Sequence, residues 1–129
     1  MSRTAVLISA LSMMLAMGTP GAAQTRATPE ETRTPDEVIA AQVFTEEFLN
    51  DRANFEAGRD LWFGQCALCH GTKAYPGKAP KLKPARYKPE FVFKRTYKGF
   101  KGMPAWRDIF TIEEIRMMVA YIKSPDFSP

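Results

Sequence analysis

Cysteine and histidine are scarce in this chain of 129 residues, which contains two cysteines and one histidine. A structural zinc site uses four Cys or His ligands, so these three residues cannot complete one. Long apolar runs are also missing, because the longest, from Ala5 to Met17, falls short of the roughly 20 residues that span a bilayer. No stretch shows a strand signal or an alternation of strands and helices, which argues against a thioredoxin-like βαβ unit.

The two cysteines and the histidine lie together in the motif Cys66-Ala67-Leu68-Cys69-His70. Two thiols three positions apart can each add to one vinyl group of a porphyrin, and the adjacent imidazole can then bind the iron. A bare Cys-x-x-Cys has three other interpretations, namely a redox dithiol, half of a zinc site and a local disulfide. The missing βαβ pattern and the missing fourth ligand weaken the first two. The motif therefore predicts one haem c, bound covalently through Cys66 and Cys69.

The first 23 residues have the composition of a secretory signal peptide. Arg3 precedes the apolar stretch, and small residues follow it from Gly18 to Ala23. An uncleaved membrane anchor is the alternative, but such a short apolar stretch anchors poorly. We therefore expect cleavage near Ala23 and export to the periplasm. That compartment suits covalent haem attachment, although it would also permit a disulfide between the two cysteines.

The rest of the chain predicts a short leading segment followed by one small domain. Residues 24–35 are rich in Thr, Ala, Pro and Glu without apolar periodicity, which indicates a flexible tether. From Thr34 onwards, a capping Thr, a Pro in the first turn and a Glu three residues after the cap predict an extra N-terminal helix over 36–50. The haem domain then occupies 51–129.

This domain is expected to be all-α with a thin core. Apolar residues at helical spacing, a second Thr-x-x-Glu cap and breaks at Gly99 and Pro125 predict three helices, over 54–66, 89–99 and 111–125. The stretch from His70 to Lys88 is rich in Gly, Pro and Lys, so we expect a loop there. Because so short a chain buries little apolar surface by itself, we expect the haem-free protein to be poorly folded.

The order of four motifs resembles the class I, mitochondrial-type c-type cytochromes, in the monohaem form of the bacterial periplasm. The resemblance covers about residues 53–124, and its motifs are Gly58 with Trp62 ahead of Cys66, Ala79-Pro80-Lys81-Leu82, Gly102-Met103-Pro104-Ala105-Trp106, and Ala120-Tyr121-Ile122-Lys123. It implies the cytochrome c fold, with three to four helices wrapped around one covalently attached haem. The helix expected over 36–50 lies outside that family core.

The resemblance also assigns roles to individual residues. His70 and the Met103 sulfur would bind the iron from opposite faces, and the carbonyl of Pro80 would accept the Nδ1 proton of His70. Leu82 would pack on the ring and Trp106 would belong to the core beside it. A packing role is the alternative for Met103, since methionine fills irregular gaps readily.

Iron with two bound side chains has no open position, so we expect one-electron transfer rather than catalysis on a substrate.

Ten Lys and Arg residues against one acid, Glu90, lie between Lys73 and Lys101, whereas nine acids against four Arg lie between Gln24 and Asp60. A basic ring around a haem edge would steer acidic redox proteins, the dehydrogenase donor and the acceptor. A merely solvated lysine-rich loop is the alternative, and anionic lipid headgroups are a further candidate partner. We expect a monomer and no nucleic-acid partner, because aromatic interleaving is missing.

Three function classes remain open. The first is a soluble carrier between a dehydrogenase and an oxidase or other acceptor, and the family resemblance suggests quinoprotein alcohol dehydrogenases as donors. The second is a haem c subunit of a larger redox complex, with residues 24–50 as its docking arm. The third is an enzyme or gas sensor of the c′ type, in which the haem motif lies near the C-terminus. This class fits least, because about 60 residues follow His70.

Overall fold

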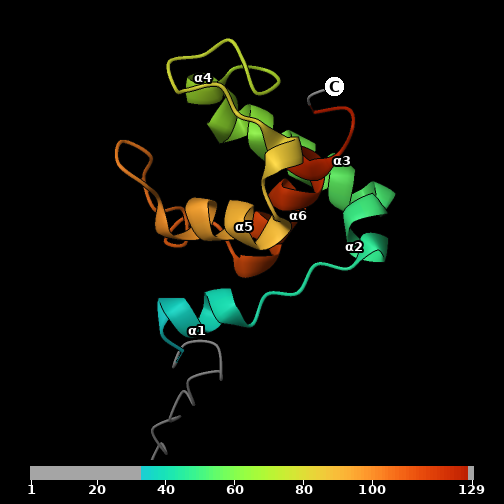
Figure 1. Ribbon diagram of the computed structural model, residues 1–129, viewed down its shortest axis with the longest axis vertical. Coiled ribbons are helices and arrows are strands. Elements are labelled where there is room, and N and C mark those ends of the chain that lie inside the picture. Colours follow the sequence, from blue (N-terminus) through green and yellow to red (C-terminus); the bar gives the residue numbers. More distant parts are fainter. Residues whose placement is uncertain (1–32, 128–129) are drawn as a thin grey trace, which may run out of the picture.

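The computed structural model describes residues 33–127, and that part of the chain is all-α (Figure 1). In chain order its elements are α1 (Pro35–Ala40), α2 (Glu46–Asn50), α3 (Arg52–Leu61), the π-helical turn η1 (Trp62–Cys66), α4 (Ala67–His70), the 3-10 turn η2 (Pro84–Arg86), α5 (Pro89–Lys98) and α6 (Ile112–Lys123). Residues 33–127 contain no strand, only two isolated bridges. The predicted all-α fold class is confirmed. The expected signal peptide over 1–23 and the tether up to residue 32 lie outside the described residues.

The crossing of α3 and α6 forms the centre of the fold. The capping box expected at the start of α6 is present: the Thr111 hydroxyl accepts from the Glu114 N–H, and the Glu114 carboxylate accepts from the Thr111 N–H at 2.7 Å. Most of the second half of α6 is buried against α3. Gly58 of α3 lies at the crossing, where a Cβ atom would overlap the backbone carbonyl of Met117. The small residue therefore lets the two helices approach closely.

An aromatic cluster closes one end of this crossing. Phe127, which follows α6, is buried, and its ring lies edge-on to Trp62 with 4.6 Å between ring centroids. The ring of Tyr121 in α6 lies 5.3 Å from Phe127 and 5.5 Å from Phe55 in α3. Edge-to-face contacts of this kind stabilise a core beyond the area they bury. The segment after α6 thus folds back onto the helix that leads to the cysteines.

The helix predicted over 54–66 is interrupted by a change of helical type. It begins at Arg52, because the Asp51 side chain accepts from the Asn54 N–H, and it runs as an α-helix to Leu61. The next five residues then form the wider turn η1. The wider turn leaves Trp62 and Cys66 buried, while the three residues between them face solvent. π-helical turns of this kind are rare and are often found at functional sites.

The single helix expected over 36–50 is divided into α1 and α2. The α1 capping box formed by Thr34 and Glu37 is present, as expected. A second cap follows at Thr45, whose hydroxyl accepts from the Phe48 N–H at 3.2 Å. The first helix ends at Ala40, and residues 41–45 connect it to α2, which starts after Thr45 because an N-cap residue adopts extended backbone.

The leading segment, residues 34–50, packs against the rest of the domain (Figure 1). Val38 is buried, and Asp36 forms an ion pair with Lys98 of α5 at 2.8 Å. Arg116 of α6 donates to the Gln42 side chain at 3.0 Å and to the Val43 carbonyl at 3.1 Å. Its guanidinium also stacks on two aromatic rings of the segment, Phe44 and Phe48. In the described part of the chain, no helix has the length and apolar character needed to cross a membrane.

Candidate functional site

The two cysteines lie on consecutive helical turns at the end of the α3–η1–α4 stretch. Both are free thiols; Cys66 is buried and Cys69 is exposed. The Cys66 Sγ atom lies 3.9 Å from the Sδ atom of Met118. Burial raises the pKa of the Cys66 thiol to about 11, so this group is protonated at neutral pH. A local disulfide was one interpretation of the sequence motif. It is not formed in the structure, because both cysteines are free, and both sulfurs are available as thiols.

The loop predicted after His70 folds back over the cysteine motif. The Ala79 N–H donates to the Cys69 carbonyl at 2.8 Å, and Gly77 lies so close to the same carbonyl that a Cβ atom would overlap it. At the start of the loop, Gly71 has a φ of 83°, a left-handed conformation that favours glycine. Further along, the Leu82 N–H donates to the Ala74 carbonyl at 3.2 Å, and the half-buried Leu82 side chain packs against the core.

His70 is partly buried at the end of α4. Among residues 33–127, its Nδ1 atom has no hydrogen-bond partner although that atom is buried. Burial lowers the pKa of the imidazole, which keeps it neutral at pH 7, the form that binds a metal ion. The hydrogen bond expected from Nδ1 to the Pro80 carbonyl is not formed here. The backbone next to Pro80 is instead bonded to Cys69, through the Ala79 N–H.

Trp62 holds the backbone that follows His70. Its Nε1–H donates to the carbonyls of both Gly71 and Thr72, at 3.2 Å each, and its ring lies 5.7 Å from the imidazole of His70 between centroids. The sequence placed Trp62 on the helix but gave no sign of these bonds. Their acceptors lie nine and ten residues further along the chain, across a loop whose path the sequence does not specify.

Met103 lies in a separate loop that is anchored to the end of α5. Phe100 and Met103 exchange two backbone hydrogen bonds of 3.0 Å each, so the chain reverses between them. Gly99 stands against the Met103 carbonyl with no room for a Cβ atom. At the far end of the loop, the Trp106 N–H donates to the Thr96 carbonyl at 3.1 Å. The side chains of Met103 and Trp106 are half-buried.

The structure therefore gathers the predicted site residues into two groups. Cys66, Cys69 and His70 share the η1–α4 stretch, whereas Met103 and Trp106 share the loop between α5 and α6. Figure 1 shows one loop beyond α4 at the top and the other beyond α5 at the left. Two free thiols, a neutral imidazole with an unpartnered nitrogen and a thioether are the donor set of a c-type haem, so these residues fit that group.

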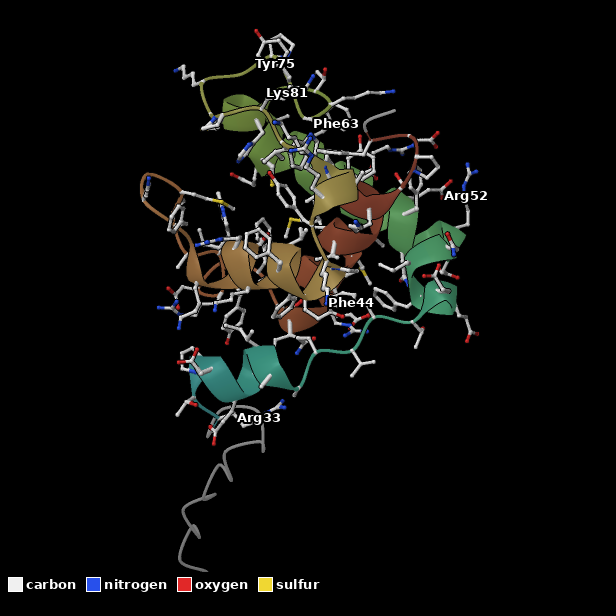
Figure 2. All side chains as sticks on the ribbon, in the orientation of Figure 1. Arg33, Phe44, Arg52, Phe63, Tyr75 and Lys81 are labelled. Carbon is white, nitrogen blue, oxygen red and sulfur yellow. The ribbon has the colours of Figure 1, made fainter. Side chains whose placement is uncertain are left out.

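The surroundings of the site are basic. The lysines of the loop after His70 are exposed, and Lys81 lies over the ring of the exposed Tyr75 at 5.9 Å (Figure 2). Across residues 33–127, no three His, Cys, Asp or Glu side chains gather in a way that could hold a metal ion, as a zinc site would require.

The chain is a c-type cytochrome domain. The family described as "Cytochrome C oxidase, cbb3-type, subunit III" matches residues 53–122, more than half of the chain, and the chain belongs to this family. The matched range contains both site groups and the α3–α6 crossing. The domain therefore has the cytochrome c fold, binds haem c covalently and is of the electron-transferring kind. The resemblance to c-type cytochromes is confirmed, while the class I assignment and the single haem stay predictions.

The chain is also similar to part of a larger enzyme. It is 34% identical over 77 residues to the quinohemoprotein alcohol dehydrogenase ADH-IIG of Pseudomonas putida. The match covers 57% of this chain but only 11% of that protein, so the likeness concerns one segment of the enzyme. No solved structure matches the chain significantly.

Proposed function

We propose that this protein is a monohaem, class I cytochrome c of the periplasm that carries single electrons from a dehydrogenase to an oxidase or another acceptor. The observation that supports it most is the division of the site into two groups, each anchored by backbone bonds. One presents both thiols and the imidazole of His70, and the other presents the thioether of Met103. With His70 and Met103 both bound, no position remains for a substrate on the iron, which favours outer-sphere transfer.

The roles proposed for the side chains follow from their chemistry. Cys66 and Cys69 would hold the haem through thioether bonds, and the neutral His70 imidazole and the Met103 sulfur would bind its iron. When bound, the haem supplies a one-electron Fe(III)/Fe(II) couple. Leu82 and the half-buried rings of the core would exclude water, which together with the thioether raises the potential.

The proposed donor is a dehydrogenase of the quinoprotein type. Support comes from the 34% identity to a segment of a quinohemoprotein alcohol dehydrogenase. The exposed lysines of the loop after His70 add support, because a basic surface near a haem edge steers acidic partners. Export would follow from cleavage near Ala23, and N-terminal sequencing of the protein from periplasmic extract should begin close to Gln24.

A second candidate is a haem c subunit of a larger redox complex, which the description of the family favours. In that arrangement the leading segment would act as a docking arm. The described part of that segment already packs on its own domain through Val38, the Asp36–Lys98 pair and Arg116. These contacts favour the free carrier. A protein that purifies as a monodisperse monomer would support the carrier, and co-purification with a stoichiometric partner would support the subunit.

Electron transfer from a purified quinoprotein alcohol dehydrogenase tests the proposed donor. We compare the wild-type protein with the triple variant Lys73→Glu, Lys78→Glu, Lys81→Glu in stopped flow. The rate constant for reduction should fall about 10-fold at low salt, and the difference should shrink as salt rises. Glu46→Lys with Glu47→Lys, a charge change on α2, is the control and should leave the rate within about two-fold. Equal rates for the wild-type and triple variants at low salt would contradict the proposed steering.

A further inference from the structure

An exposed stack of one arginine and two phenylalanines lies at the end of α5. The Arg95 guanidinium lies 3.8 Å from the centroid of the Phe100 ring and 4.9 Å from that of Phe91. Both rings are substantially exposed, at 50% and 41%. Across residues 33–127, Arg95 forms no ion pair with a carboxylate, so the aromatic rings are its main partners. The two rings and the guanidinium that lies over them therefore form a cation–π contact outside the core.

Phe100 connects this stack directly to the proposed iron ligand. It shares two backbone hydrogen bonds with Met103, each 3.0 Å long. Between them, Lys101 has a φ of 52°, in the left-handed region that residues with a side chain adopt only at an energetic cost. A turn that carries such a residue requires support from outside the turn.

Beyond the Gly99 N–H, which donates to the Arg95 carbonyl at the end of α5, two further contacts attach the loop from Gly99 to Trp106 to this helix. At one, the Trp106 N–H donates to the carbonyl of Thr96, a buried residue whose hydroxyl in turn donates to the Val92 carbonyl at 3.1 Å. The other is the Arg95 stack on Phe100, on the surface. The first attachment is part of the core, so the second is the place where the position of Met103 can be changed without disturbing the core.

We propose that Arg95 is a positioning residue for Met103: by stacking on Phe100 it holds the Met103 loop closed and keeps the thioether on the iron. The inference rests on the proposed function, because it takes Met103 as a ligand. In this role Arg95 acts through the ring and backbone of Phe100, not as a ligand. The stack is charged and planar, a geometry that arginine supports better than lysine.

Carbon monoxide uptake by the reduced, haem-loaded protein measures how often Met103 leaves the iron, because the gas binds only when that position is open. Arg95→Leu should speed uptake about 5-fold, the change expected from loss of an exposed cation–π contact. It should also weaken the sulfur-to-iron absorption band of the oxidised protein. Arg95→Lys should speed uptake less than Arg95→Leu, by about two-fold, because a lysine can still lie over the ring but stacks on it less well.

Arg116→Leu is the matched control. Arg116 also stacks on two phenylalanines, at 4.8 Å and 4.4 Å, but these rings belong to the leading segment. This variant should lower the thermal midpoint and leave carbon monoxide uptake unchanged. Phe100→Leu should reproduce the effect of Arg95→Leu, and the double variant should match either single one, since both act through one contact.

The outcomes separate this inference from the proposed function. A wild-type protein that binds carbon monoxide immediately and lacks the sulfur-to-iron band would overturn Met103 ligation itself. A wild-type protein that shows the band, together with an Arg95→Leu variant of unchanged uptake, would overturn only the role of Arg95. The inference would also be overturned if Arg116→Leu accelerated carbon monoxide uptake as much as Arg95→Leu, or if the effects of Arg95→Leu and Phe100→Leu on uptake were additive. Either result would mean that the stack only stabilises the fold in general.

Discussion

Gly58 of α3 and Met117 of α6 touch through their backbones, since a Cβ atom on Gly58 would overlap the Met117 carbonyl oxygen. The obstacle is backbone inside a capped, mostly buried helix, so it cannot rotate away as a flexible side chain would. The close approach also brings Phe55 of α3 and Trp62 of the following turn η1 into contact with Tyr121 of α6. Gly58 thereby determines the separation of the two helices, one of which leads directly to the cysteine motif.

Replacement of Gly58 by alanine should therefore destabilise the domain strongly. We expect Gly58→Ala to lower the free energy of unfolding by about 3 kcal/mol, at the upper end of overpacking effects, because the backbone of α6 has to move. Denaturant unfolding of the haem-loaded protein measures this. Gly64→Ala is the matched control, since no atom lies within 4 Å of a Cβ at that position. If the two variants were equally stable, α3 and α6 would not cross as described.

Trp62→Phe should loosen the backbone after His70. The phenylalanine keeps most of the buried ring but cannot donate to the carbonyls of Gly71 and Thr72. We expect a loss of about 2 kcal/mol in unfolding free energy, from one lost donor and the smaller ring together. Amide hydrogen exchange should accelerate in the loop that follows His70. The comparison variant is Phe63→Leu, at a neighbouring exposed ring, which should change neither quantity noticeably.

Arg116→Leu should release the leading segment from α6. The arginine side chain is largely buried, donates to Gln42 and Val43, and stacks on two rings of the segment. Loss of these contacts should lower the unfolding free energy by about 2 kcal/mol. Limited proteolysis should then cut the connection at 41–45 faster than in the wild-type protein. Unchanged proteolysis would show that Val38 and the ion pair at Asp36 are enough to hold the segment.

The two capping boxes offer a paired test of which helices matter for global stability. Thr111→Ala removes the cap of α6, the central helix, and should lower the unfolding free energy by about 1 kcal/mol. Thr34→Ala removes the equivalent cap of α1, a short helix at the edge of the domain. Its effect should fall below about 0.5 kcal/mol, since α1 can fray locally. Thermal unfolding of both variants gives the comparison, and the reverse order would contradict the proposed centre of the fold.

Features coded by neighbouring residues could be predicted from the sequence. The caps at Thr34 and Thr111, the stop at Gly99 and the cysteine motif are local patterns with a local physical cause, and all of them appear in the structure. Gly58 belongs to a motif of the family resemblance, and the structure shows that a Cβ atom there would overlap the backbone of α6.

One local feature was missed: the second cap at Thr45 competes with the apolar periodicity that favoured one helix over 36–50. The other features that could not be predicted depend on distant partners. The bonds of Trp62, the Arg116 contacts and the Arg95 stack join residues whose proximity only the folded chain establishes. In a sequence, an arginine that stacks on aromatic rings looks the same as one surrounded by water. The basic charge could therefore be predicted from the sequence, but the aromatic partners of the arginines could not.

The most direct test of iron ligation by His70 and Met103 is the absorption spectrum of the reduced, haem-loaded protein with and without carbon monoxide, for the wild-type protein and for Met103→Leu. Ligation by His70 and Met103 predicts a sharp low-spin spectrum that the gas does not change in the wild-type protein, and a complete carbon monoxide adduct in the variant, where the position opposite His70 is open. A wild-type protein that forms the adduct as readily as Met103→Leu would contradict the binding of Met103 to the iron and would favour a gas-binding or enzymatic role instead.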